Sequence, residues 1–265
     1  MTVAELRQSS WIVLLLAASP IAACGVTSTS GGPAGASDAA AATGQHPRTL
    51  SRRMVREVEG RYLLFLPASY DGSRPERWPM ILFLHGAGER GDNLHLVMRH
   101  GPPKRVEQHP DFPFVVVSPQ VATDRIWSNA FLDALLDEVV ASYAIDPDRV
   151  YLTGLSMGGY GAWSLAMEFP HRFAAMAPVS GGGVPSGACA LKHLPIWVFH
   201  GTKDDVVPLD RDTQLVTRLR ECGGNVRFTV YPDAGHDAWT RTYDDPELYD
   251  WFLRHRRQPP AAAPR

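Results

Sequence analysis

Short runs of apolar residues alternate with amphipathic stretches along the chain from about residue 47 onward. Helices are predicted at about residues 131–143, 157–169, 209–220 and 246–255. The continuous apolar runs predict buried strands at residues 61–66, 80–84, 114–117, 149–153, 173–179, 195–199 and 226–231. Near-continuous apolar strands that alternate with helices are typical of a mostly parallel sheet covered by helices on both faces. The expected fold class is therefore α/β, with any site at the carboxyl ends of the strands.

The first 23 residues have the pattern of an export signal. Residues 1–10 are polar, and the apolar run from Trp11 to Ala18 is too short for an ordinary membrane-spanning helix. The tetrad Ile21–Cys24 resembles a bacterial lipobox, in which the cysteine becomes the lipidated first residue. We expect a signal peptide at residues 1–23 and a lipid anchor at Cys24, hence an exported protein, either anchored in the cell envelope or secreted. The alternative is an ordinary secretory signal with an incidental cysteine.

Composition sets the domain boundaries. Residues 25–44 are rich in Ser, Gly, Ala and Thr and lack large apolar side chains, so they cannot pack a core. We expect a flexible tether at residues 24–46, beginning with the lipidated cysteine, then one domain at residues 47–258 and a disordered tail at residues 259–265.

Charge and cysteine content exclude several functions. A formal net charge of −2 provides no basic field for nucleic acid and no polybasic face for anionic lipid. The three cysteines form no Cys-x-x-Cys pair, and no histidine spacing suggests zinc. The expectation is a monomer that binds no nucleic acid, metal or cofactor and meets a membrane only through Cys24.

The sequence Gly154-Leu155-Ser156-Met157-Gly158 lies between a predicted strand and a predicted helix. A Gly-x-Ser-x-Gly turn in this setting lifts the serine hydroxyl above the sheet, and its small residues avoid clashes in the turn. Ser156 is therefore the candidate nucleophile. The alternative interpretation is a glycine-rich turn that only starts a helix.

A serine hydroxyl needs an adjacent base, and His236 is the preferred histidine. It lies in the loop after the last predicted strand, with Gly235 before it. His85 is the strongest rival, although a buried ring that ties down its own loop is the structural interpretation. His200 also ends a strand and is interpreted as packing or bonding loops, and the remaining histidines as surface or loop residues.

The acid that orients the histidine should lie between nucleophile and base along the chain. The segment from His200 to Pro208 follows the penultimate strand and offers two adjacent carboxylates, Asp204 and Asp205. The position of Asp237 beside His236 makes it a poor candidate, because neighbours on a loop rarely face each other.

Acyl transfer also requires donors aimed at the oxygen that becomes negative. The backbone amide of Met157, directly after the candidate nucleophile, is one expected donor. The loop His85-Gly86-Ala87-Gly88 supplies the other, with the amide of Ala87 preferred and that of Gly86 as the alternative.

The chain from about Arg61 to Arg254 resembles the bacterial phospholipase/carboxylesterase-like branch of the α/β-hydrolases, which includes proteins labelled predicted peptidase or poly(3-hydroxybutyrate)-depolymerase-like. The resemblance implies an α/β-hydrolase catalytic domain without a large lid. Its Asp-x-Val-Val-Pro spacing favours Asp204 over Asp205 as the acid. Other proteins of the branch are labelled dienelactone-hydrolase-like esterases. A dienelactone hydrolase proper has a cysteine nucleophile, and Ser156 departs from that pattern. The matching motifs are Leu84–Asp92, Gly154–Gly159, His200–Pro208 and Ala234–His236.

The leading functional hypothesis is a carboxylic-ester hydrolase that forms an acyl-enzyme on short-chain, aryl or polysaccharide-linked esters. A serine peptidase of the prolyl-oligopeptidase kind and a non-enzymatic surface lipoprotein are the alternatives. Trp127 and Trp239 are candidates for the walls of a substrate pocket, although tryptophans more often only pack. Glu89, Arg90 and Asp92 either contact substrate or form an ion-paired brace of the loop.

An exported domain matures in an oxidising compartment, where Cys189 and Cys222 can pair. Cys189 precedes a strand, and Cys222 ends the helix that returns toward the start of that strand, so both should lie at its amino-terminal edge. We expect a disulfide, worth roughly 3–4 kcal/mol on the chain-entropy model. The alternative is two separate cysteines packed as small apolar groups.

Overall fold

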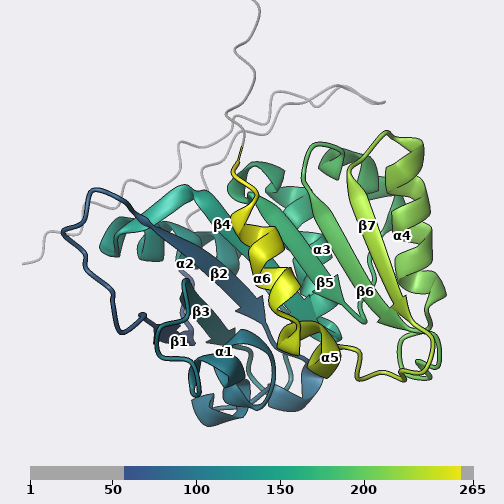
Figure 1. Ribbon diagram of the computed structural model, residues 1–265. Coiled ribbons are helices and arrows are strands. Elements are labelled where there is room, and N and C mark those ends of the chain that lie inside the picture. Colours follow the sequence, from purple (N-terminus) through teal and green to yellow (C-terminus); the bar gives the residue numbers. More distant parts are fainter. Residues whose placement is uncertain (1–56, 258–265) are drawn as a thin grey trace, which may run out of the picture. The chain divides into compact units, whose positions relative to one another are not determined.

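A seven-stranded sheet runs through residues 57–257, the part of the chain that the computed structural model describes (Figure 1). Its order is β1-β3-β2-β4-β5-β6-β7, and β1 pairs antiparallel with β3 while every other pair is parallel. The strands are β1 (Arg61–Phe65), β2 (Trp78–Leu84), β3 (Val115–Gln120), β4 (Ile145–Leu155), β5 (Ala175–Val179), β6 (Ile196–Gly201) and β7 (Val226–Tyr231).

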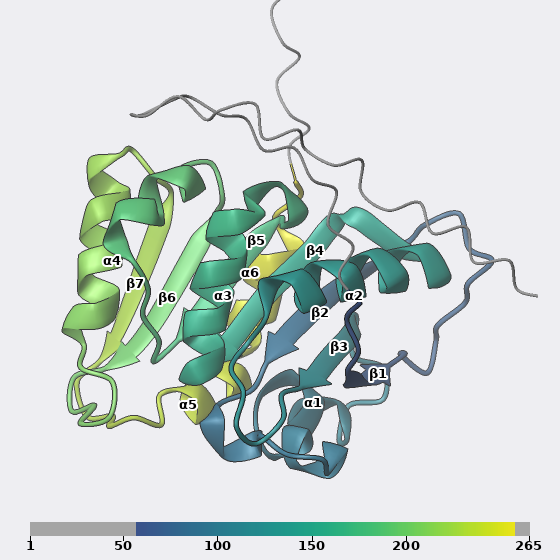
Figure 2. The same ribbon diagram turned by 180° about the vertical axis from the view of Figure 1, so that it is seen from behind.

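Helices cover both faces of this sheet, as the sequence pattern predicted. In Figure 1, α6 crosses the face nearest the viewer, and Figure 2 shows α2, α3 and α4 on the opposite face. The helices are α1 (Gly101–Val106), α2 (Asn129–Ser142), α3 (Met157–Glu168), α4 (Asp210–Glu221), α5 (Trp239–Asp244) and α6 (Pro246–Leu253). The α/β fold class is therefore confirmed.

Alternation of side chains along the strands divides the interior into two cores. Leu82 of β2 packs in the core that α2, α3 and α4 cover, whereas Phe83 packs in the core that α6 covers. Both side chains are fully buried. Central strands such as β2 and β5 are apolar on both faces because both faces are covered.

The predicted strands and long helices are all present, with ends shifted by a few residues. Strand β4 begins at Ile145, earlier than predicted. The pattern did not indicate its first part because Asp146, Pro147 and Asp148 interrupt the apolar run there. Helices α1 and α5 were not predicted, since six residues are too few to show a helical period. Helix α1 also opens with glycine and two prolines.

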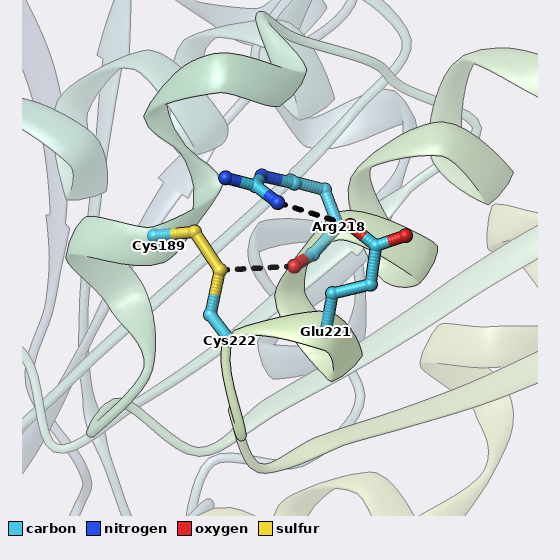
Figure 3. The surroundings of a disulfide bond; sticks show 4 residues. All are labelled: Cys189, Arg218, Glu221 and Cys222. Carbon is cyan, nitrogen blue, oxygen red and sulfur yellow. Dashed lines mark hydrogen bonds and ion pairs between the residues drawn. A yellow bond between two sulfur atoms is a disulfide. The ribbon is translucent and has the colours of Figure 1, made fainter.

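The disulfide prediction is confirmed, because Cys189 and Cys222 are bonded with their Cα atoms 5.6 Å apart (Figure 3). Cys189 lies in the short 3-10 helix Pro185–Leu191, and Cys222 caps the end of α4. The bond ties the connection between β5 and β6 to the helix that follows β6, at the amino-terminal end of that strand.

No helix within residues 57–257 is long and apolar enough to cross a membrane. The predicted signal peptide, Cys24, the tether and the tail at residues 259–265 lie outside the described residues.

Candidate active site

Ser156 stands on the sharp turn between β4 and α3. Its backbone has φ 53° and ψ −118°, a conformation that non-glycine residues rarely adopt. The turn is possible only because its neighbours are small: a Cβ atom added at Gly158 would overlap the carbonyl oxygen of Leu84. The Ser156 amide donates to the carbonyl of Val179 at 2.9 Å, which fixes the turn against β5.

His236 lies in the loop after β7 and reaches the serine. Its Nε2 atom is 2.9 Å from Ser156 Oγ, although the two residues are 80 positions apart in the chain. The hydroxyl of Ser180, at the end of β5, donates to the backbone carbonyl of His236 at 2.9 Å and holds the loop. Trp239 packs edge-on against the imidazole, with ring centroids 5.0 Å apart.

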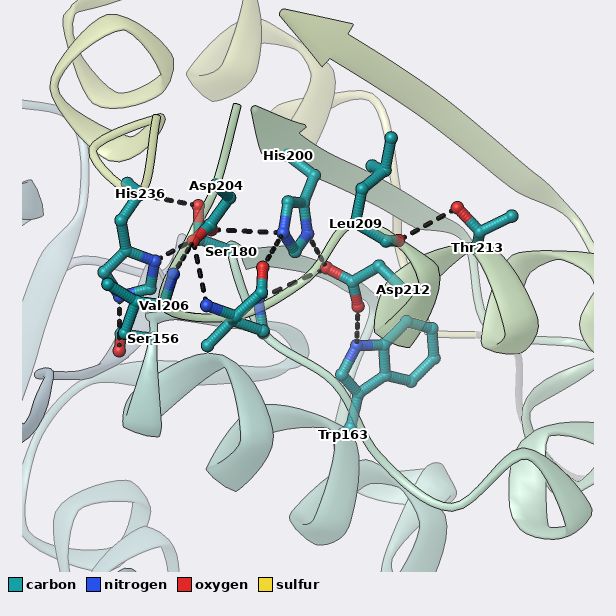
Figure 4. Close-up of polar contacts among 12 residues, drawn as sticks. Ser156, Trp163, Ser180, His200, Asp204, Val206, Leu209, Asp212, Thr213 and His236 are labelled. Atoms are coloured by element: carbon teal, nitrogen blue, oxygen red, sulfur yellow. Dashed lines mark hydrogen bonds and ion pairs between the residues drawn. The ribbon is translucent and has the colours of Figure 1, made fainter. Parts of the chain in front are cut away.

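Asp204 completes the chain of hydrogen bonds, as Figure 4 shows. Its Oδ2 accepts from His236 Nδ1 at 2.8 Å. Its Oδ1 accepts from the backbone amides of Val206 and Val207, at 3.0 and 2.8 Å. The Asp204 side chain is buried, whereas Asp205 is exposed. The structure therefore brings Ser156, His236 and Asp204 together and leaves Asp205 outside.

The loop after β2 lies beside the serine and presents backbone amides. The Gly86 amide donates to the carboxylate of Glu89 at 3.0 Å, which removes it from the candidate donors. Within residues 57–257, no side chain or loop carbonyl accepts from the amide of Ala87 or of Met157. Arg90 Nε donates to the Ala87 carbonyl at 3.0 Å, so Glu89 and Arg90 both brace the loop.

His85 is part of this brace. Its ring is buried, with Nδ1 2.6 Å from the carbonyl oxygen of Gly86 and Nε2 accepting from the Val121 amide at 3.0 Å. Burial is the main reason that the pKa of His85 is lowered to about 4. A ring with both nitrogens engaged and no proton to gain near neutral pH is a structural element, as the alternative interpretation of His85 held.

The contact between the buried Asp204 side chain and His200 was not predicted from the sequence. His200, at the end of β6, lies 3.2 Å from Asp204 through its Nε2 atom and 2.8 Å from Asp212 of α4 through its Nδ1 atom. A signal for Asp212 was present, since it shares one helical face with the buried Leu215, Val216 and Leu219. A carboxylate on an apolar face needs a buried partner.

A cavity of about 760 Å³ opens beside Met157 and runs along α3. Exposed apolar side chains form its rim, with Ile126 75% and Val184 65% exposed. Trp127 lines this cavity, whereas Trp239 lines a separate, smaller one. The other lining residues are Asn129, Tyr160, Gly161, Ser164, Met167, Glu168 and Gly183. Residues 57–257 contain no cluster of His, Cys, Asp and Glu that could hold a metal ion.

The fold and the serine–histidine–aspartate geometry are those of an α/β-hydrolase. Residues 112–246 match the model of the phospholipase/carboxylesterase family. Feruloyl esterase C of Emericella nidulans is 31% identical over 223 residues, which cover 69% of this chain and 79% of that protein. A probable feruloyl esterase C of Aspergillus niger is 29% identical over 199 residues, covering 71% and 72%.

A crystal structure of a thermostable esterase is similar as well, with 35% sequence identity and a TM-score of 0.65. The match covers 74% of this chain and 59% of that one. The chain belongs to the phospholipase/carboxylesterase family of α/β-hydrolases, and it is a carboxylic-ester hydrolase.

Proposed function

We propose that this esterase works through an acyl-enzyme on Ser156, with His236 as general base and Asp204 as the orienting acid. The observation that carries the proposal is the continuous chain of contacts, 2.9 Å from Ser156 Oγ to His236 Nε2 and 2.8 Å from His236 Nδ1 to Asp204. A serine hydroxyl is a weak nucleophile until such a base removes its proton.

The donor and acceptor of the proton can be named for each step of the proposed reaction. Ser156 Oγ attacks the ester carbonyl carbon while its proton passes to His236 Nε2, and the amides of Ala87 and Met157 stabilise the oxyanion. Collapse of the tetrahedral intermediate breaks the bond to the alcohol, which leaves with the proton from His236. Water then attacks the acyl-enzyme while its proton passes to His236. The bond to Ser156 Oγ breaks, Oγ takes the proton back from His236, and the carboxylic acid is released.

The substrate class that we propose is an ester of an aryl or short acyl group, linked to a polysaccharide. The names of the feruloyl esterase relatives support an aromatic acid. The long cavity supports it too, because Ile126, Tyr160 and Val184 offer apolar surface in a cavity that Met157, the residue after Ser156, also lines. An exposed apolar patch of this kind is typical of a ligand groove.

A panel of substrates tests this assignment: a feruloylated oligosaccharide, a methyl ferulate, an acetyl ester and a dipeptide amide. We expect hydrolysis of the esters, covalent labelling by a fluorophosphonate, and no cleavage of the amide. Faster cleavage of the amide than of every ester would favour the peptidase alternative. Absence of both labelling and turnover would favour a non-enzymatic protein.

The cavity is tested with the same panel. Replacing both Ile126 and Val184 with serine should lower kcat/KM for the ferulate about tenfold or more, because apolar contact with the ring is lost. Hydrolysis of the acetyl ester should change little. Leu253→Ser, an exposed apolar position on α6 across the sheet, is the matched control. Equal losses for the ferulate and the acetyl ester would exclude the cavity as the aryl site.

The same protein is proposed to be exported and anchored through Cys24. The apolar run followed by Ile21–Cys24 supports export, and so does the Cys189–Cys222 bond, since disulfides persist in oxidising compartments. Cys24→Ser should abolish metabolic labelling with a fatty acid and release an active esterase from the membrane fraction. Equal labelling of the wild type and the variant would leave only the ordinary secretory signal.

A further inference from the structure

A chain of buried polar side chains continues beyond Asp204, on the side away from Ser156 (Figure 4). His200 Nδ1 lies 2.8 Å from Asp212 Oδ2. His200 Nε2 lies 2.8 Å from the carbonyl oxygen of Val207 and 3.2 Å from Asp204 Oδ2. The side chains of His200, Asp204 and Asp212 are all fully buried, so water does not complete their hydrogen bonds.

The partners of Asp212 are donors. The indole of Trp163, on α3, donates to Asp212 Oδ1 at 2.9 Å. The amide of Gly181 donates to Asp212 Oδ2 at 3.2 Å, beside the His200 ring. Hydrogen bonds from N–H groups favour the ionised form of a carboxyl group. Asp204 is in the same position, because two backbone amides donate to its Oδ1 atom.

His200, by contrast, faces only acceptors. Its two ring nitrogens meet the Asp212 carboxylate on one side, and the Val207 carbonyl and the Asp204 carboxylate on the other. A neutral imidazole carries one proton, so one nitrogen would point a lone pair at an acceptor oxygen. It would also leave two buried carboxylates without a cation between them, which is costly.

We propose that His200 is a buried imidazolium cation, held by Asp212, that positions Asp204 for His236. This rests on the proposed function, since it concerns the acid of the same triad. The direction of the pKa agrees. Burial alone lowers the pKa of His200, but the hydrogen bonds to Asp212 and Val207 and the charges of Asp212 and Asp204 outweigh it and raise that pKa above its ordinary value.

The charged groups near His200 come from α4 and from the loops after β6 and β7. Asp212 faces it from α4, Asp204 from the loop after β6, and His236 lies beyond Asp204 on the loop after β7. From α3 the neighbour is the uncharged Trp163 indole, which contacts Asp212. Among residues 57–257, no other charged side chain lies within ion-pair distance of His200.

The net charge of this buried cluster changes during the proposed reaction. With His236 neutral, two carboxylates and one imidazolium give the buried cluster one excess negative charge. When His236 accepts the proton of Ser156, two cations balance two anions. A cluster that becomes balanced at this moment favours proton transfer, because its dipoles and charges are already in place before the reaction.

The protonation state of His200 is measured directly by long-range ¹H–¹⁵N correlation NMR of the purified protein with ¹⁵N-labelled histidine. The ring signals are assigned by their loss in His200→Gln or, if that variant does not fold, by their shift in Asp212→Asn. We expect both ring nitrogens of His200 to be protonated above pH 6.5, where an ordinary histidine is mostly neutral. One protonated and one bare nitrogen at pH 7, with the proton on Asp212 instead, would overturn the proposal.

A kinetic test separates positioning from a purely structural role. Asp212→Asn removes one charge that holds the His200 proton, so His200 should become neutral as the pH rises through the ordinary histidine range. We expect kcat to fall about 10- to 100-fold at pH 8, the scale seen when a partner that orients a metal-binding histidine is removed. The loss should be smaller at pH 6, and KM should be nearly unchanged. A loss of equal size at both pH values would indicate a structural role only.

Asp146→Asn is the matched control, since it also removes an ion-paired aspartate, one that contacts Arg149 and Arg256 at the far end of β4. Its pH profile should follow the wild type. Ser156→Ala distinguishes the two levels of failure. If Ser156→Ala stays active, the proposed function fails whatever the charge of His200. If Ser156→Ala is inactive while His200 is neutral, only the present inference fails.

Discussion

Replacement of Ser156 by alanine should reduce ester hydrolysis at least about 10³-fold without unfolding the domain. The reason is geometric: Ser156 Oγ is the hydroxyl that lies 2.9 Å from His236 Nε2, at a strained turn near the amides of Ala87 and Met157, for which residues 57–257 offer no acceptor. Alanine keeps the Cβ atom and the turn but has no nucleophile. Initial rates on the acetyl ester, with circular dichroism for the fold, measure the effect.

His236→Ala should cost a similar factor, because serine and histidine act as one unit and their losses do not add. Ser142→Ala and His193→Ala, at exposed positions, serve as matched controls and should keep wild-type rates. Retention of more than a tenth of wild-type turnover by folded Ser156→Ala protein would contradict the assignment. The Ser156→Ala variant should also not react with the fluorophosphonate.

The second large effect concerns the acid, and here the chain contains its own control. Asp204→Asn should lower kcat about 10³- to 10⁴-fold, because Asp204 Oδ2 accepts from His236 Nδ1 and its charge stabilises the imidazolium formed in the reaction. Asp205→Asn, at the adjacent exposed position, should stay within about twofold of wild type, as surface substitutions usually do.

The pair is best compared under saturating ester, so that kcat rather than binding is measured. Both substitutions remove one negative charge from the same loop, so a long-range charge effect would lower both rates alike. Equal losses, or a larger loss in Asp205→Asn, would show that the structural placement of Asp204 does not correspond to a role in turnover.

Local patterns in the chain were sufficient to find most of the site. The Gly154–Gly158 turn identified Ser156 as the candidate nucleophile. A sharp strand-to-helix turn requires small residues at fixed positions, and these positions are close together in the sequence. Likewise, β2, β3, β5 and β6 were predicted well because every residue along them is buried. Helices α1 and α5 were missed because their stability comes from neighbouring elements rather than from a pattern of their own.

Local patterns could not predict which side chains contact each other in the site. Asp204 and Asp205 have the same chemistry, and only the fold buries one against His236 and exposes the other. The contact of His200 with Asp212 was missed for the same reason, because it joins a strand to a helix. The cavity rim likewise combines Ile126 and Val184, which are far apart in the chain.

The linear chain thus determined the fold class, the candidate nucleophile, the candidate base and the cysteine pair, because these depend on periodicity, turn chemistry and the order of elements. The tertiary structure decided which carboxylate lies against His236, which backbone amides beside Ser156 have no acceptor within residues 57–257, and how His200 is held between Asp204 and Asp212. The physical reason is that the burial of a side chain and its hydrogen-bond partners depend on how the interior packs. A charge without water must be matched by whichever group the fold places beside it.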